Sequence, residues 1–251
     1  MSKVVHLNST MSKKRPGVEA AIRLTRSREG RLWNRVEAQF KDILSSVEEL
    51  ETCHDDYEKL RRQLFGGEGE DALKDYLTKE ELKTVIRWKF SVGKKRHALM
   101  KHLNSNSEKT VEEFSRRAIA LARDIKFHED KENDDKDIKA AIEELTNLRG
   151  VGPASSSAIL SMVRPDLFCY MYDEIIDCFL PKRTYTLKVY LEVNEQCRKI
   201  ADSIEGWTTS RVARALWVAA RACAWGKEDY TLGLDREEEE FEKSSKRRRK
   251  S

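Results

Sequence analysis

Apolar residues recur along most of the chain at intervals of three and four positions, which is the spacing of amphipathic helices. The first such segment begins after Arg31, with apolar positions at Leu32, Val36, Phe40, Ile43, Leu44 and Val47. A second begins at Thr78, where Glu81 three residues later completes the capping-box pattern of a helix N-terminus. Both segments predict helices that bury one face in a core.

The same period continues through the second half of the chain. Ser107 or Thr110 is the predicted start of a further helix. Three more helices are expected over 138–147, 184–204 and 209–225. Because only residues 184–193 have a mild strand bias, we predict an all-α fold.

Composition divides the chain into a helical domain and two tails. We expect a disordered basic tail over 1–28, a helical domain over 29–230 and a disordered charged tail over 231–251. Inside the domain, the Gly-Gly-Glu-Gly-Glu run at 66–70 predicts a loop. The almost wholly charged residues 128–137 predict a second, solvated loop.

The charge balance limits the classes of partner. Charged residues make up 37% of the 251 residues, against an average of about 25%, and the net charge is only +4. The whole molecule is therefore not a polycation, and the location of the charge matters more than its sum. No stretch approaches the roughly 18 apolar residues of a transmembrane helix, and the first thirty residues lack a secretory signal, so no membrane partner is expected.

The cysteines and histidines show no metal-ligand spacing. There are five cysteines, an odd number, and no pair has CxxC spacing. A zinc site or a disulfide framework is therefore not predicted, and reduced thiols in the cytosol or nucleus are expected. We predict neither a metal nor a cofactor.

The most informative segment of the chain is 148–160, where a predicted helix turns into another across two glycines. Gly150 and Gly152 permit a tight turn and a close backbone approach, and Val151 between them can point into the core. Pro153 suits the first position of the second helix, where its missing N–H group costs nothing. The small residues 154–158 let two helices pack closely.

Such a turn leaves backbone N–H groups free at a helix N-terminus, where they bind anions, most commonly a nucleic-acid phosphate. The predicted DNA-binding residues of this segment are Gly150, Val151, Gly152, Ala154 and Ser155. A phosphate contact would position double-stranded DNA without specifying its bases. The alternative is an ordinary connection between two helices.

A basic run before the hairpin could add phosphate contacts. It comprises Lys94, Lys95 and Arg96, followed by His97. A solvated helix end explains the run equally well.

The hairpin resembles the helix-hairpin-helix motif of the DNA glycosylase superfamily, through Leu-x-Gly-Val-Gly at 148–152, the small residues after it and Ala-Ile-Leu at 158–160. It is also similar to a group of eukaryotic proteins that share a Gly-Val-Gly-Pro-Ala turn and a following Asp-Glu. The resemblance implies a glycosylase-like all-α fold whose hairpin holds a phosphate near a flipped nucleotide. It also implies that Asp173, at the matching distance after the hairpin, is the catalytic aspartate of base excision.

Three departures from the superfamily pattern bear on the activity. Members that also cleave the DNA backbone have a lysine at the position of Ala154, so the resemblance does not imply an imine-forming lyase here. The iron–sulfur cysteine cluster of some members is absent, and Glu-Ile-Ile at 174–176 replaces their asparagine–valine segment. Two hypotheses stay open: a monofunctional DNA glycosylase acting through Asp173, and a non-catalytic scaffold that binds DNA or a protein.

Asp173 itself has two interpretations. It is the catalytic carboxylate if the resemblance extends to activity, or a plain helix N-cap, a role that aspartate fills well. Asp177, one helical turn later, is predicted to be a surface or capping residue.

The C-terminal basic run predicts a nuclear protein. It comprises Lys246, Arg247, Arg248, Arg249 and Lys250. We interpret it as a nuclear localisation signal or a loose DNA tether. The sequence thus predicts a monomeric nuclear protein that binds double-stranded DNA and belongs to DNA repair if Asp173 is active.

Overall fold

The computed structural model describes residues 17–45, 48–65, 74–93, 96–126 and 131–224, and over these residues the chain is all-α. Helices and short loops make up the whole of this part. In chain order the helices are α1 (Val18–Arg26), α2 (Gly30–Ala38), α3 (Phe40–Ser45), α4 (Glu48–Phe65), α5 (Lys79–Val92), α6 (His97–Asn104), α7 (Glu108–Asp124), α8 (Lys131–Thr146), α9 (Pro153–Val163), α10 (Asp173–Phe179), α11 (Leu187–Asp202) and α12 (Thr209–Ala224).

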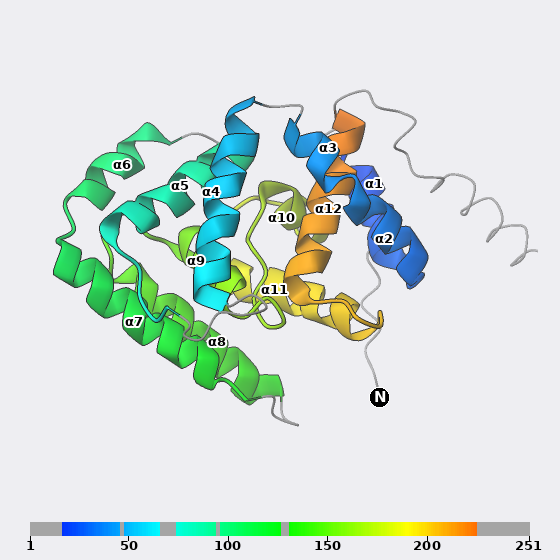
Figure 1. The fold of residues 1–251 in the computed structure, drawn as a ribbon. Coiled ribbons are helices and arrows are strands. Elements are labelled where there is room, and N and C mark those ends of the chain that lie inside the picture. The colour runs from blue at the N-terminus through cyan, green and yellow to red at the C-terminus, as the bar shows by residue number, and fades with distance from the viewer. Residues whose placement is uncertain (1–16, 46–47, 66–73, 94–95, 127–130, 225–251) are drawn as a thin grey trace, which may run out of the picture.

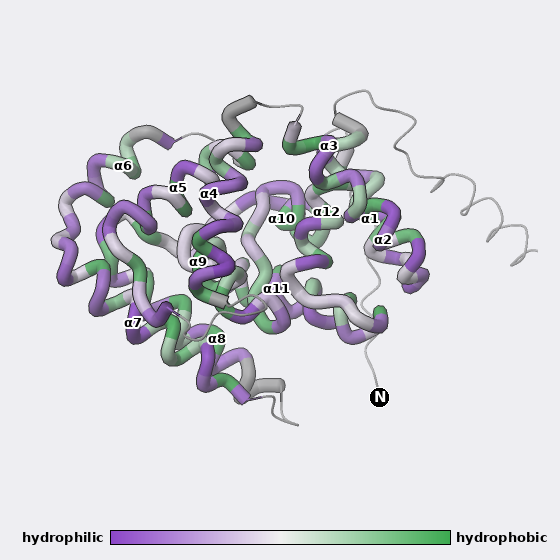
Figure 2. Tube along the Cα trace, viewed as in Figure 1, coloured by the Kyte–Doolittle hydropathy of each residue, from purple (hydrophilic) through white to green (hydrophobic). Residues whose placement is uncertain are grey.

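The helices form two neighbouring groups (Figure 1). In the first group, α12 packs against α1, α2, α3, α10 and α11; in the second, α9 packs against α4, α5, α7 and α8. One continuous cluster of buried apolar side chains joins the two groups. Hydrophobic and hydrophilic positions alternate along α7 and α8, as expected for helices that bury one face (Figure 2). None of the described helices combines the length and hydrophobicity that crossing a bilayer requires.

Helix α9 is the central helix of the second group. All ten residues from Ala154 to Val163 are buried, because this segment contains only small and apolar side chains. Pro153 is its first residue, as predicted. The buried Ser157 hydroxyl accepts a hydrogen bond from the Met171 backbone N–H at 3.1 Å, which ties α9 to the chain that leads into α10.

The predicted helix starts at Thr78 and Ser107 are confirmed. Thr78 accepts a hydrogen bond from the Glu81 N–H, and the Glu81 carboxylate accepts one from the Thr78 N–H, which completes the capping box. Ser107 is the N-cap of α7 and accepts a hydrogen bond from the Thr110 N–H at 3.1 Å. These starts were predictable because the capping side chain lies within three residues of the group that it satisfies.

Three local predictions were wrong. Residues 18–26, placed in a disordered tail, form α1, whose Val18, Ala21 and Leu24 stripe packs against α12. Residues 131–137, predicted as a loop, belong to α8. They form its N-terminal turns, where the helix dipole favours acidic residues. The apolar period after Arg31 is divided at Gln39 into α2 and α3. The predicted loop at 66–70 lies outside the described residues.

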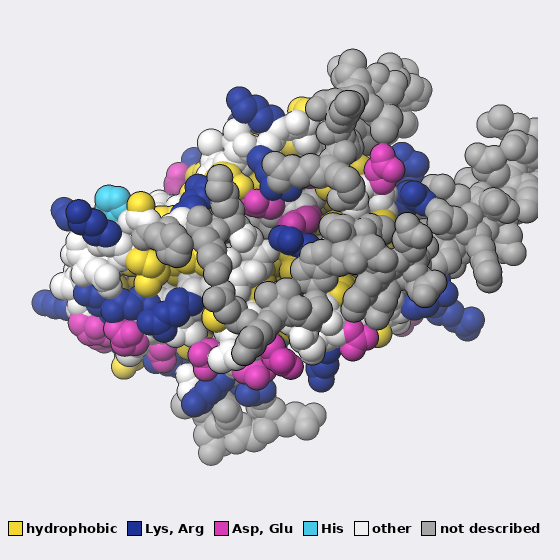
Figure 3. Space-filling model, turned by 90° about the horizontal axis from the view of Figure 1, so that it is seen from above, with side chains coloured by type: hydrophobic (Ala, Val, Ile, Leu, Met, Phe, Trp, Pro, Cys, Tyr) yellow, Lys and Arg dark blue, Asp and Glu magenta, His cyan; other side chains and the backbone are white. Residues whose placement is uncertain are grey.

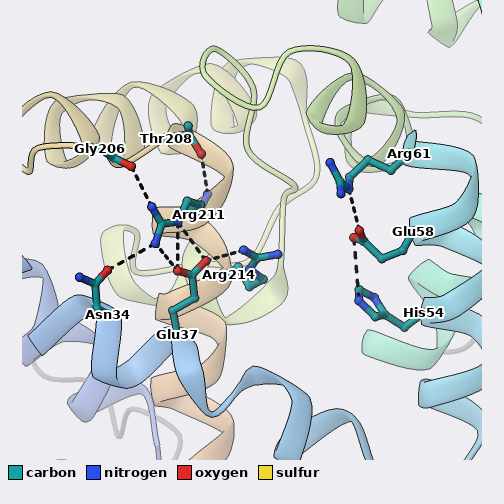
Figure 4. A network of polar contacts seen from close by, with 9 residues as sticks. All are labelled: Asn34, Glu37, His54, Glu58, Arg61, Gly206, Thr208, Arg211 and Arg214. Atoms are coloured by element: carbon teal, nitrogen blue, oxygen red, sulfur yellow. Dashed lines mark hydrogen bonds and ion pairs between the residues drawn. The ribbon is translucent and has the colours of Figure 1, made fainter. Parts of the chain in front are cut away.

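An ion-pair network ties α2 to α12 (Figure 4). Arg211 and Arg214 of α12 converge on the Glu37 carboxylate, with an Arg211 Nη2 to Glu37 Oε2 distance of 2.5 Å. The Glu37 side chain is only 13% exposed. Burial by itself would raise the pKa of Glu37, but the hydrogen bonds from Arg211 and Arg214 outweigh it and lower the pKa below 4.5.

The substitution Glu37→Gln is expected to lower the free energy of unfolding at pH 7 by about 2 kcal/mol, because two guanidinium groups lose their carboxylate. The lowered pKa means that this stability is present above the ordinary pKa of glutamate and is lost as the pH falls through the folded-state value. Urea unfolding at pH 7 and at pH 3 tests this, with the exposed Glu192→Gln as control. A Glu37→Gln deficit that is equal at both pH values would contradict the assignment.

Candidate functional site

The glycine hairpin connects α8 to α9 with the geometry that the sequence indicated. Gly150 has φ +82°, a left-handed conformation that favours glycine. Val151 is buried, as predicted, and its N–H donates to the Leu148 carbonyl at 3.0 Å. Val151 therefore anchors the turn in the core and presents no side chain to a ligand.

The two glycines have different roles. A Cβ atom at Gly150 would lie 3.0 Å from His102 Cβ and 3.2 Å from backbone atoms of Leu99 and Leu103, so the turn packs directly against α6. Gly152 has an extended backbone, and a Cβ there would meet nothing within 4 Å. Packing therefore requires a glycine at position 150, whereas position 152 faces open space.

Asn106 holds the hairpin through both backbone groups of Arg149. Its side-chain amide donates to the Arg149 carbonyl at 2.9 Å, and its side-chain oxygen accepts from the Arg149 N–H at 2.9 Å. The side chain is buried, and it also donates to the Leu103 carbonyl. Asn106 thus fixes the hairpin relative to the end of α6. The sequence contained no signal for this role, because the two partners lie 43 residues apart.

The hairpin leaves backbone donors unused. The N–H groups of Ser155 and Ser156 donate to the Gly152 carbonyl, and Pro153 has no N–H group. Among the described residues, the N–H groups of Gly152 and Ala154 donate to no backbone or side-chain acceptor. These two donors are therefore free to bind an anion at the start of α9.

A pocket of about 140 Å³ lies beside the hairpin. It brings together most of the predicted site residues, since the six that line it are Arg96, Gly150, Gly152, Ala154, Ser155 and Asp173. Lys94, Lys95 and the basic run at 246–250 lie outside the described residues. A cavity of about 150 Å³ holds a benzene molecule, so this pocket is the size of one small ring.

Asp173 is the first residue of α10 and lines the pocket. Its Oδ2 accepts from Arg183 Nη1 at 2.9 Å, and its Oδ1 accepts from the Tyr185 hydroxyl at 2.7 Å. The N-cap of α10 is Tyr172, and no side chain caps this helix. The interpretation of Asp173 as a plain N-cap is therefore wrong.

Arg183 joins two carboxylates of α10. Besides Asp173, it donates through Nε and Nη2 to Asp177, at 2.7 and 2.5 Å. Asp177 is only 19% exposed, so it is an ion-pair partner and neither a surface nor a capping residue. Burial lowers the pKa of Arg183, but Asp177 and Asp173 outweigh it and raise the pKa, so the guanidinium stays charged. Burial and the hydrogen bond to Asp173 raise the pKa of Tyr185 to about 12.

Lys89 of α5 contributes an amine to the same pocket. Its Nζ donates to the buried Ser155 hydroxyl at 3.0 Å. Burial, with a smaller contribution from the positive charge of Arg96, lowers the pKa of Lys89 to about 8, against an opposing effect of Asp173. Sequence reasoning missed Lys89; the available signal was a single lysine between Trp88 and Phe90, both in the core.

Aromatic side chains form one wall of the pocket. Tyr170 and Tyr172 line it, with ring centroids 4.3 Å apart. Trp88 lies behind Tyr170 at 4.9 Å and stacks on Tyr57 at 3.8 Å. Burial raises the pKa of Tyr170, so the phenol stays neutral. Tyr170 and Tyr172 are each only 5% exposed, so this wall presents a small aromatic surface to the pocket.

Exposed basic side chains occur on α6, at its N-cap and in the turn before α9. Figure 3 shows Lys and Arg side chains gathered at the end of the molecule that holds α6. Arg96, Lys101 and Arg149 are exposed, and Arg96 lies over the Tyr185 ring at 4.7 Å. Arg96, the predicted basic residue, thus lines the pocket. Lys101 and Arg149 are further exposed cations that no sequence motif indicated.

No protein-family model matches the chain, and no curated protein or solved structure gave a significant match. Within the described residues, no group of three or more histidine, cysteine, aspartate or glutamate side chains has the arrangement of a metal site.

Proposed function

We propose that this chain binds double-stranded DNA through the hairpin at 148–160 and excises a base from a nucleotide that is flipped into the adjoining pocket. The observation that supports the proposal is the position of Asp173 in the same pocket as Gly152 and Ala154. A candidate phosphate contact and a candidate catalytic carboxylate thus line the same small pocket. This is the arrangement that the resemblance to the DNA glycosylase superfamily implies.

Phosphate binding has a direct physical basis at this turn. The unused N–H groups of Gly152 and Ala154 lie at the N-terminus of α9, where the helix dipole also favours an anion. Arg96 and Arg149 have exposed side chains that add positive charge nearby. Asn106 holds the backbone of Arg149 and leaves its side chain exposed. These contacts would position the duplex and would not select its sequence.

The pocket suits a single flipped ring. Its volume is close to that of a cavity that holds benzene, and its wall includes Tyr170 and Tyr172. An enzyme that acts on a base must first remove the base from the stack. The Asp173 carboxylate would then stabilise the positive charge that develops on the sugar as the N-glycosidic bond breaks.

A non-catalytic scaffold that binds DNA or a protein is the second candidate. Both Asp173 oxygens are engaged, one by Arg183 and one by Tyr185, which suits a purely structural carboxylate. Glu174 follows it, almost fully buried and paired with Arg221 at 2.8 Å. A partly buried ion pair therefore lies at the position of the superfamily's asparagine–valine segment. The nuclear location proposed from the basic run at 246–250 applies to both candidates.

The substitution Gly152→Val tests the hairpin contact. We expect it to weaken duplex binding about tenfold, because the valine side chain would occupy the open space that a phosphate must enter and a charge-assisted hydrogen bond would be lost. Valine accepts the extended backbone at this position, so the unfolding midpoint should not change. Equilibrium binding is measured at two salt concentrations.

The control is Gly30→Ala, at the start of α2, where a Cβ makes only an ordinary contact with Ile204. It should bind the duplex as the wild type does. Wild-type affinity in a folded Gly152→Val variant would exclude the hairpin as the phosphate contact. Gly150 is unsuitable for this test, because its substitution strains the turn and meets α6.

A further inference from the structure

We propose that the turn between α1 and α2 is a second contact for duplex DNA, separate from the hairpin at 148–160. The contact consists of Arg26, Arg28 and Arg31, which we call the arginine turn. These side chains would hold the sugar–phosphate backbone and would not select a base sequence. The ligand is that of the proposed function, but the surface is a different one, so this contact does not depend on the hairpin.

Positive charge is concentrated in this short part of the chain. Residues 23–35 contain five arginines and one glutamate, a net charge of +4, which equals the net charge of all 251 residues. The side chains of Arg26, Arg28 and Arg31 are exposed, and among the described residues none of the three forms an ion pair with a carboxylate. Their charge is therefore available to an anionic partner.

Hydrogen bonds fix the backbone of the arginine turn. Arg28 Nη1 donates to the carbonyl oxygens of Thr25 at 2.7 Å and Ser27 at 2.9 Å. The Ser27 carbonyl also accepts from Trp33 Nε1 at 3.2 Å. Trp33 is fully buried and packs edge-on against Trp207, with ring centroids 5.3 Å apart. Because the backbone that carries the arginines is already ordered, binding a ligand here costs little conformational entropy.

Helix stability does not explain the arginine at position 31. Arg31 lies in the first turn of α2, which contains no acidic residue, and a cation at this end opposes the helix dipole. Arg26, by contrast, lies in the last turn of α1, where a cation stabilises the helix. A role in binding accounts for an exposed arginine at a position that is unfavourable for its own helix.

The surroundings of the arginine turn favour the backbone of a duplex over other acidic partners. A single strand is held by exposed aromatic rings on which its bases stack, but Trp33 and Trp207, the two tryptophans behind this turn, are buried. A protein or membrane partner would need exposed apolar side chains, and among the described residues the only large one is Leu121, on α7. The planar guanidinium of arginine can donate two parallel hydrogen bonds to a phosphate.

The arginine turn lies far from the hairpin. Helices α2 and α6 are at opposite ends of the molecule (Figure 1), and the hairpin packs against α6 through Gly150. The two proposed contacts therefore lie apart on the protein. Because distant sites act independently, substitutions at the two contacts should have additive effects on the free energy of binding.

The experiment measures duplex affinity against salt concentration for the full chain that carries Arg26→Gln and Arg31→Gln together. We expect the slope of log affinity against log salt to become shallower by about 2, since each lost phosphate contact lowers it by about 0.9. Affinity at about 0.1 M salt should fall at least tenfold. Arg26→Lys with Arg31→Lys keeps both charges and should keep the slope. The control, Lys136→Gln with Lys139→Gln, removes the same charge from exposed side chains of α8 and should change the slope by less than about 0.5.

The outcomes separate this inference from the proposed function. An unchanged slope in the folded glutamine variant, or an equal change in the lysine control, overturns the arginine turn as a contact and leaves the hairpin standing. A shallower slope in the glutamine variant, with wild-type affinity in Gly152→Val, excludes the hairpin contact and supports the arginine turn. Absence of duplex binding by the wild type overturns both contacts.

Two further measurements complete the test. Thermal unfolding of every variant is followed, and a shallower slope supports the inference only in a variant that unfolds at the wild-type temperature. Binding of poly-glutamate is compared with binding of a duplex of equal charge. A wild-type preference for poly-glutamate that the Arg26→Gln, Arg31→Gln variant loses would assign the arginine turn to an acidic protein and overturn the inference.

Discussion

Asp173→Asn is expected to reduce base release from damaged or mismatched duplex DNA at least about 100-fold. The neutral amide keeps the shape of the side chain but removes the negative charge that would stabilise the sugar cation. Release of free base from a panel of lesion-containing duplexes is the measurement, with duplex affinity determined in parallel. Affinity should change little, because the proposed phosphate contact lies at Gly152 and Ala154.

Asp177→Asn is the matched control for this substitution. Both aspartates belong to α10 and both accept hydrogen bonds from Arg183, with side chains 18% and 19% exposed. Only Asp173 lines the pocket. The two variants should therefore lose similar stability, while only Asp173→Asn loses base release. An equal loss of base release in the two variants would attribute the effect to the loss of the Arg183 ion pairs and to the fold. Absence of base release by the wild type would support the non-catalytic scaffold.

The second large effect is expected on stability. Arg183→Met should lower the free energy of unfolding by about 3 kcal/mol, because it leaves Asp173 and Asp177 facing each other without their shared cation. The guanidinium donates to both carboxylates and is only 18% exposed, so water compensates poorly for its loss. The pair of carboxylates on one helical turn is then repulsive.

Urea unfolding with a constant m-value measures this loss. The control is Arg87→Met on α5, whose side chain is 55% exposed and whose distance to Glu80 is 3.9 Å, and it should cost less than about 1 kcal/mol. A loss of that small size for Arg183→Met would show that the two carboxylates find other partners. Arg183 would then contribute little to holding α10 in place.

The parts of the site that the sequence predicted depend on neighbours in the chain. Gly150, Val151 and Pro153 could be assigned because a glycine turn, a buried valine and a helix-starting proline form one local pattern. The helix starts at Thr78 and Ser107 could be predicted for the same reason.

The remaining parts come from distant elements. Lys89 meets Ser155 across 66 residues, and Asn106 meets Arg149 across 43. Neither residue belongs to a motif, and each is defined only by the packing of α5, α6 and α9. The position of Asp173 beside the hairpin was predictable. Its two partners, Arg183 and Tyr185, were not, because they follow it by ten and twelve residues without any periodic pattern.

The burial of α9 from Ala154 to Val163 bears on how this molecule changes during evolution. Every side chain from Ala154 to Val163 touches the interior, so almost any enlargement creates overpacking, whatever the activity of the protein. Selection for folding alone would therefore preserve this helix among descendants. Changes in activity should instead accompany substitutions of Lys89, Arg96 and Tyr185, which line the pocket from elements other than α9. Relatives that share the hairpin but differ at these three positions would be expected to differ in chemistry.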